Sequence, residues 1–113
     1  MQKTIAGILA SVGDEHATDV LVTDSRSWKC TTNNEADWMQ PTFDDSSWPA
    51  AVVSYPNLPN QPHHHQMSAI SPKASWIWTS KFSDPDMDHV VYCRGHLRMF
   101  ILVVAKTFLF FLF

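Results

Sequence analysis

Ala74-Ser75-Trp76-Ile77-Trp78-Thr79 is the stretch of sequence that decides the fold class. Aromatic and β-branched side chains favour strands, and residues two apart on a strand lie on the same face. Trp76 and Trp78 therefore share a face, a pattern typical of a sheet surface turned towards a core. Short runs of similar character, separated by turn signals, occur at 7–12, 19–23, 27–31, 52–55 and 90–93. No convincing helix-period stretch precedes residue 97, so the sequence predicts an all-β fold.

The length and composition fit one small globular domain. The chain has 113 residues, of which 45% are hydrophobic, and it contains five tryptophans. Its formal net charge is -3, and Lys and Arg are scattered singly without a basic patch. A protein that binds a phosphate backbone needs such a patch, so we expect no nucleic-acid partner.

The turn-rich segment 37–49 separates two of the predicted strands. Pro41 and Pro49 exclude a long helix across it. Asp44 or Asp45 is expected to cap a single helical turn over Ser46 to Trp48. Adjacent side chains on an extended chain point in opposite directions, so the two aspartates do not suggest an acid/base pair.

The aromatic residues have two interpretations. Indole rings offer a stacking platform for the apolar face of a sugar, or they fill the core of the sheets. Their alternation along the strands favours the core, and we expect Trp38 and Trp48 to pack over the end of the sandwich. The residues assigned a structural role are Trp28, Trp38, Phe43, Trp48, Trp76, Trp78 and Tyr92.

Cys30 and Cys93 lie in two separate predicted strands. They form one disulfide if the compartment is oxidising, and otherwise they are two buried thiols. The separation of their Cα atoms decides between these alternatives, and spacing along the chain does not provide it.

Two groups of side chains suggest metal binding, each with a simpler alternative. Asp84, Asp86 and Asp88 alternate in a turn, so they form either a calcium site or a solvated strand connection. The Gly and terminal Glu of a calcium-loop signature are absent. The run His63-His64-His65 lies in a Pro-rich loop, where exposed imidazoles are the expected arrangement. Apart from calcium, no cofactor is expected, and no catalytic residue is assigned.

The C-terminal segment 99–113 is nearly all apolar and has one charged residue, Lys106. A helix that spans a membrane needs about 20 apolar residues, which is more than this segment provides. Three interpretations stay open: a strand with a sticky tail, a marginal membrane segment, or sequence foreign to the domain.

Several of these segments together resemble galactose-binding-like jelly-roll domains, which occur beside glycoside hydrolases and in extracellular proteins. The resemblance covers about 80 residues and is carried by the order and spacing of the segments SWKC at 27–30, FDDSSWPAA at 43–51, ASWIWT at 74–79 and VYCRG at 91–95. It implies a β-sandwich over residues 7–97. Members of this family continue beyond the VYCR-like strand, so the resemblance also implies that the jelly roll here is incomplete and that the apolar tail replaces its later strands.

The resemblance implies a non-catalytic carbohydrate-binding or adhesion-type module of an extracellular or cell-surface protein, with a carbohydrate or glycoprotein as partner. Two alternatives remain: a structural accessory domain without a ligand, and a fragment of a glycoside hydrolase that lacks its catalytic domain. The apolar run Ile5 to Ala10 is short for the core of a signal peptide.

Overall fold

The computed structural model describes residues 4–61, 65–96, 102–108 and 110–111. Within these ranges the chain forms strands and no helix, which confirms the all-β class. The strands are β1 (Thr4–Ile5), β2 (Ser11–Gly13), β3 (Asp19–Val22), β4 (Trp28–Thr31), β5 (Val52–Pro56), β6 (Ser75–Trp78), β7 (Val90–His96), β8 (Leu102–Phe108) and β9 (Phe110–Phe111).

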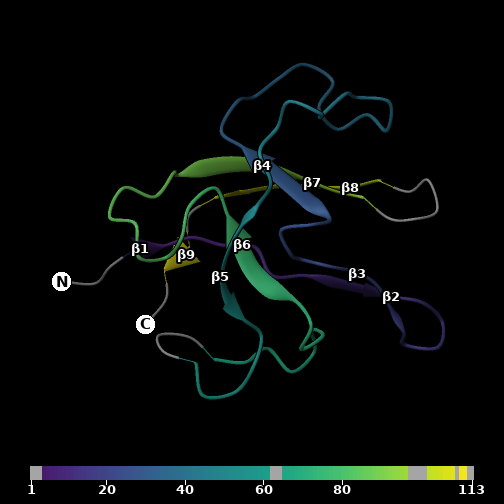
Figure 1. Ribbon diagram of the computed structural model, residues 1–113, viewed down its shortest axis with the longest axis vertical. Coiled ribbons are helices and arrows are strands. Elements are labelled where there is room, and N and C mark those ends of the chain that lie inside the picture. The colour runs from purple at the N-terminus through teal and green to yellow at the C-terminus, as the bar shows by residue number, and fades with distance from the viewer. Residues whose placement is uncertain (1–3, 62–64, 97–101, 109, 112–113) are drawn as a thin grey trace.

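All strand pairs are antiparallel, and the largest sheet has three strands in the order β4-β7-β8 (Figure 1). A second sheet pairs β5 with β6, and Ile8 forms a bridge to Ile77 of β6. The strand-like runs at 7–12 and 19–23 correspond in part to β2 and β3, which pair antiparallel. The chain passes from the β4-β7-β8 sheet to the β5-β6 sheet at Ala50, which bridges to Lys29 of β4 just before β5 begins.

The described part of the apolar tail continues the sheet. β8 pairs with β7 along its whole length, from Val90 opposite Phe108 to His96 opposite Leu102. β9 pairs with the N-terminal strand β1. The structure thus favours the strand interpretation of this segment, of which residues 99–101, 109 and 112–113 lie outside the described ranges. No helix formed by the described residues combines the length and the apolar character that crossing a membrane requires.

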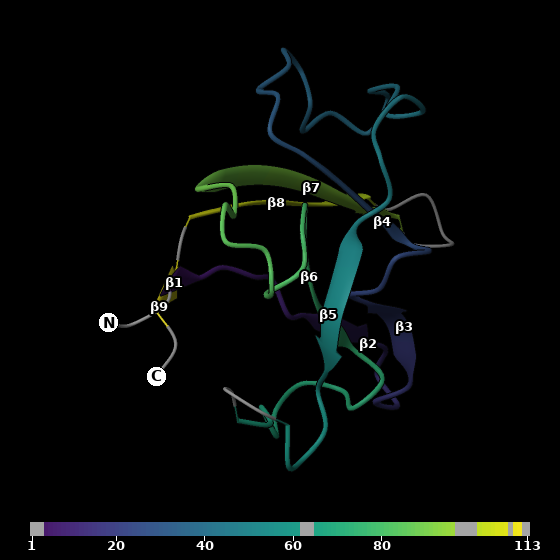
Figure 2. The same cartoon turned by 60° about the vertical axis from the view of Figure 1, so that its left-hand side comes forward.

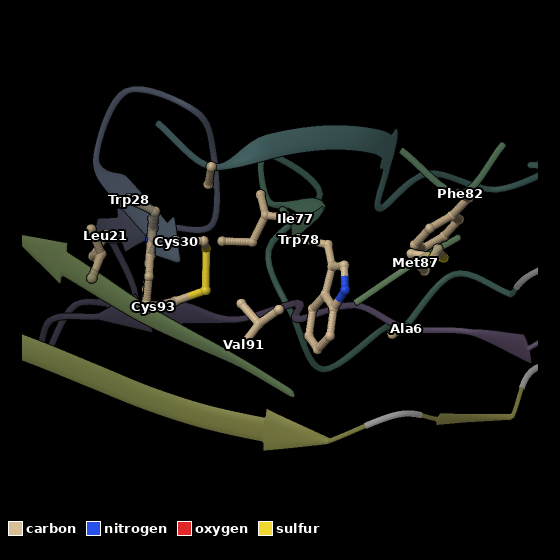
Figure 3. Packing of buried hydrophobic residues seen from close by; sticks show 11 residues of the cluster. Ala6, Leu21, Trp28, Cys30, Ile77, Trp78, Phe82, Met87, Val91 and Cys93 are labelled. Atoms are coloured by element: carbon tan, nitrogen blue, oxygen red, sulfur yellow. A yellow bond between two sulfur atoms is a disulfide. The ribbon is translucent and has the colours of Figure 1, made fainter. Parts of the chain in front are cut away.

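The main hydrophobic core lies between the β4-β7-β8 sheet and the β5-β6 sheet (Figure 3). β4 contributes Trp28 and Cys30, and β7 contributes Val91 and Cys93. From β6, both Ile77 and Trp78 are fully buried, although neighbours on a strand point to opposite faces. Both faces of β6 are therefore covered, and Trp76 also packs against the main core.

Cys30 and Cys93 form a disulfide, which is the first of the two alternatives considered from the sequence. They lie directly opposite each other on β4 and β7, with their Cα atoms 4.2 Å apart. In the non-hydrogen-bonded positions of an antiparallel pair, the Cα atoms of opposite residues are about 4.5 Å apart. The strand register itself therefore brings the two sulfur atoms together. The bond joins segments that are 63 residues apart in sequence.

One residue of β7 has no room for a side chain. Gly95 lies opposite Trp28, and the indole ring of Trp28 packs flat on the glycine backbone. A Cβ atom at this position would lie 2.5 Å from Cε2 of Trp28. The tryptophan is 2% exposed and belongs to the main core, so it cannot move aside without disturbing its neighbours.

We expect Gly95→Ala to lower the free energy of unfolding by about 1–3 kcal/mol, the usual cost of overpacking a core. Gly13→Ala is the matched control, because a Cβ there meets its nearest atom at 3.6 Å, an ordinary contact. Urea denaturation followed by tryptophan fluorescence measures both. Equal midpoints for the two variants would show that the packing of Trp28 on Gly95 does not constrain the fold.

Candidate functional site

The candidate site lies on the face of the β4-β7-β8 sheet that points away from the main core. Val91 and Cys93 of β7 point into the core, so the alternate residues Tyr92, Arg94 and His96 point to the opposite face. The segment 32–49, which joins β4 to the second sheet, arches over this outer face (Figure 1). We call this segment the covering loop.

Aromatic side chains fill the space between the covering loop and the sheet. The ring of Trp38 meets the ring of Tyr92 edge to face, with centroids 5.2 Å apart, and stacks on Trp48 at 6.4 Å. Phe43 packs on Trp48 at 5.6 Å. Trp38 and Trp48 therefore cover the outer face of the sheet, and the prediction that they lie over the end of the sandwich is wrong. They belong to a second, smaller core.

Arg94 is the most deeply buried charged residue of this face, with no exposed side-chain surface. Its Nε atom donates to Oδ2 of Asp45 at 2.8 Å. Its terminal nitrogens donate to the carbonyl oxygens of Trp38, of Gln40 at 3.2 Å and of Phe43 at 3.2 Å. The guanidinium group thus uses its rigid fork of donors to hold the covering loop by its backbone.

Asp45 joins three basic side chains from the two strands below it. In addition to Arg94, Nε2 of His96 lies 2.6 Å from Oδ2 of Asp45. Nζ of Lys29 lies 3.6 Å from Oδ1 and donates to the backbone oxygen of Asp45 at 3.2 Å. Burial raises the pKa of Asp45, but the hydrogen bonds from Arg94 and His96 outweigh it, so the pKa lies below its ordinary value.

The adjacent aspartate has a different role. Oδ1 of Asp44 accepts the N–H of Ser46 at 3.0 Å, and this hydrogen bond lowers the pKa of Asp44. Asp44 caps the turn over 45–48, which closes by a hydrogen bond from the Trp48 N–H to the Asp45 carbonyl. The capping prediction therefore fits Asp44, whereas the carboxylate of Asp45 is used in the ion pair. The described residues 46–48 form a turn and no helix.

The rim of this cluster is accessible to a ligand. The side chain of His96 is 49% exposed and that of Lys29 is 35% exposed, while Asp45 between them is 11% exposed. Asp44 is exposed beside them. Together these residues place hydrogen-bond donors and acceptors on one rigid patch. Such a patch can bind the hydroxyl groups of a ligand without a covalent step.

The three aspartates considered for calcium are used elsewhere. Oδ1 of Asp84 accepts the N–H of Asp86 at 2.8 Å, which forms a turn. Oδ2 of Asp88 accepts the hydroxyl of Thr79 at 2.5 Å. Among the residues that the structure describes, no group of three His, Cys, Asp or Glu side chains could hold a metal ion. The three carboxylates are therefore not gathered into one cation site, and those of Asp84 and Asp88 stabilise local connections instead.

The Pro-rich loop is organised by a buried residue that sequence reasoning missed. Asn57 has no exposed surface, and its Nδ2 donates to the carbonyl oxygens of Met67, Ile70 and Ser71. Its Oδ1 accepts the N–H of Met67 at 2.8 Å. His65 of this loop is exposed, and His63 and His64 lie outside the described residues.

Arg94 and His96 were also missed, although a signal was present. An arginine inside an apolar, alternating strand such as VVYCRGH must be paired if it is buried, because unpaired buried charge is very costly. The sequence offered several acidic residues as its partner. Spacing along the chain did not single out Asp45, which lies 49 positions away.

Comparison with known proteins gives no match: no family model, no curated protein and no solved structure is significantly similar to this chain. The resemblance to galactose-binding-like domains is thus an interpretation of the residue pattern alone.

Arg94→Met is expected to lower the free energy of unfolding by about 3–5 kcal/mol, because it leaves the Asp45 carboxylate buried without its main partner. Lys29→Met is the control on the same face, since Lys29 lies opposite Arg94 in the strand register. Its longer, partly exposed ion pair predicts a cost of about 0–1 kcal/mol. Equal costs in chemical denaturation would contradict the central role of Arg94.

The lowered pKa of Asp45 predicts an acid-dependent contribution to stability. A carboxyl group whose pKa is lower in the folded state stabilises the fold above its unfolded pKa, which is near 3.8. That contribution is lost as the pH falls through the lower, folded-state value. The difference in unfolding free energy between the wild type and Asp45→Asn should therefore stay level from neutral pH down to about pH 5 and shrink at lower pH. Thermal or urea unfolding at several pH values measures it, and a constant difference would contradict the assignment.

Proposed function

We propose that this chain is a non-catalytic carbohydrate-binding or adhesion-type module of an extracellular protein. The observation that supports this most directly is the buried Cys30–Cys93 disulfide inside a small all-β domain. Disulfides persist in oxidising compartments, and small extracellular domains often rely on them where the core is limited. The resemblance to galactose-binding-like jelly rolls, carried by the order of the aromatic segments, points to the same class.

The exposed rim of the Asp45 cluster is the surface that we assign to the ligand. Lys29 and His96 project from neighbouring strands, and the ion pair of Asp45 with Arg94 fixes the loop beside them. A preorganised set of polar side chains on a rigid sheet suits a sugar, whose hydroxyl groups need both donors and acceptors. Partners of this kind are free glycans or glycoproteins.

A second candidate is a structural accessory domain without a ligand, and one observation favours it. Four of the five tryptophans, Trp28, Trp38, Trp48 and Trp78, are at most 6% exposed, so their rings pack inside the domain. They are therefore not available as a stacking platform for sugars. A ligand of this chain would have to be bound mainly by hydrogen bonds at the rim.

A glycan array probed with the oxidised chain separates the two candidates. We expect binding to a limited set of glycans that His96→Ala weakens at least tenfold, a loss of about 1.4 kcal/mol. His16→Ala is the matched control, because this histidine is 77% exposed on the β2–β3 turn and away from the rim. Absence of binding by the folded wild-type chain, or equal loss in both variants, would favour the accessory domain.

A further inference from the structure

The edge of the longest sheet offers a second surface with a defined chemistry. In the order β4-β7-β8, both edges of β7 are occupied, and the far edge of β4 is bridged by Ala50. β8 runs beside β7 (Figure 2) and has no other strand partner in the part of the chain that the structure describes. Such an edge presents backbone N–H and C=O groups to any extended strand that approaches it.

The hydrogen bonds of β4 establish which backbone groups of β7 point towards β8. The carbonyl of Trp28 accepts the N–H of Ala51, and the N–H of Cys30 donates to the carbonyl of Pro49. The backbone N–H and C=O groups of both residues therefore point away from β7. In an antiparallel pair, two opposite residues either both direct their backbone N–H and C=O groups towards the other strand or both direct them away from it. Cys93 and Gly95 lie opposite Cys30 and Trp28. Their backbone N–H and C=O groups therefore point away from β4 and towards β8.

The same alternation continues into β8. Ala105 lies opposite Cys93, and Val103 lies opposite Gly95, so these two residues bond back to β7. The backbone groups of the other residues point to the free edge. These outward residues are Leu102, Val104, Lys106 and Phe108.

This outward set is symmetrical about Ala105, which makes the strand complementary to itself. If two copies of β8 pair antiparallel with Ala105 opposite Ala105, Leu102 lies opposite Phe108 and Val104 lies opposite Lys106. Every outward residue then meets an outward residue of the other copy, so every free N–H finds a C=O. A shift that centred the pair on Lys106 would place two positive charges opposite each other, which is unfavourable.

The sequence of β8 contains few of the devices that normally block such pairing. Edge strands are commonly protected by proline, bulges or several charges. β8 reads LVVAKTF, with one lysine and without proline or glycine, and its pairing with β7 is regular over all seven residues. Every copy of this chain carries the same long, regular edge, so a second copy can satisfy it across a two-fold axis.

We propose that the free edge of β8 pairs with β8 of a second copy, so that two β4-β7-β8 sheets join into one continuous sheet across a two-fold axis. The interface is closed, because each copy contributes the same edge of β8 across the two-fold axis. This association is independent of the proposed ligand site, which lies on the face of the sheet and not on its edge.

Sedimentation equilibrium of the full oxidised chain, over a dilution series from about 1 to about 100 µM, tests the proposal, and we expect a monomer–dimer equilibrium. Val104→Pro removes an outward N–H and leaves the bonds to β7, so it should be monomeric throughout with nearly unchanged thermal unfolding. Ala105→Pro is the matched control, because it removes a bond to β7 and should lower the unfolding temperature instead.

A charge pair at position 104 tests the register. In the symmetrical dimer, residue 104 lies opposite Lys106 of the second copy, and this pair occurs twice. Val104→Glu should therefore dimerise about tenfold more tightly than Val104→Lys, because two like-charge pairs become two opposite-charge pairs. Val104 lies opposite Arg94 of β7, so the two variants also place different charges beside Arg94. Their thermal unfolding is therefore measured alongside, and the dimerisation constants are compared under conditions where both variants are folded.

A monomeric wild-type chain at all concentrations would overturn the proposal, as would dimerisation of Val104→Pro as tight as that of the wild type. Open-ended growth into larger species would also overturn it, since the symmetrical pairing closes at two copies. Equal dimerisation of Val104→Glu and Val104→Lys would overturn the register about Ala105. Glycan binding is measured separately, so failure here leaves the proposed function to its own test.

Discussion

The hydrogen-bonded ion pair between Arg94 and Asp45 is the interaction on which the outer half of the molecule depends. A guanidinium group without exposed surface must have all of its donors satisfied, and four groups of the covering loop provide the acceptors. The position of the covering loop follows from this requirement. Trp38 and Trp48 are held against Tyr92 by the same arrangement, so the second core exists because the charge is paired.

β7 connects the two cores because its residues alternate between them. Val91 and Cys93 face the main core, where the disulfide joins β7 to β4, and Arg94 on the other face anchors the covering loop. Since Gly95 accommodates the ring of Trp28, the same strand also determines how closely β4 can approach. A substitution in β7 that displaces the strand would therefore affect the packing of both cores. A domain of this size has only a small core, so few other contacts would compensate.

The two proposals concern different parts of the same sheet. The polar rim of Lys29 and His96 lies on its outer face, and the self-complementary edge lies along β8. Antiparallel strands of two copies are related by an axis perpendicular to the sheet, so both outer faces would point the same way. Two weak glycan sites on one side of a dimer gain apparent affinity through multivalency, which single sites on a monomer lack.

The alternating aromatic runs around Trp28, Trp76 and Trp78 determined the all-β class and most strands, because residue periodicity is a local property of the chain. The disulfide and the β8 strand stayed among several alternatives, since Cα separation and strand pairing depend on distant segments. Sequence reasoning considered Asp45 only as an alternative cap to Asp44, and it assigned Arg94 no role as the partner of a carboxylate. Only the tertiary structure joined them, because a separation of 49 positions leaves the partner of a buried charge undetermined until the sheet and its covering loop have formed.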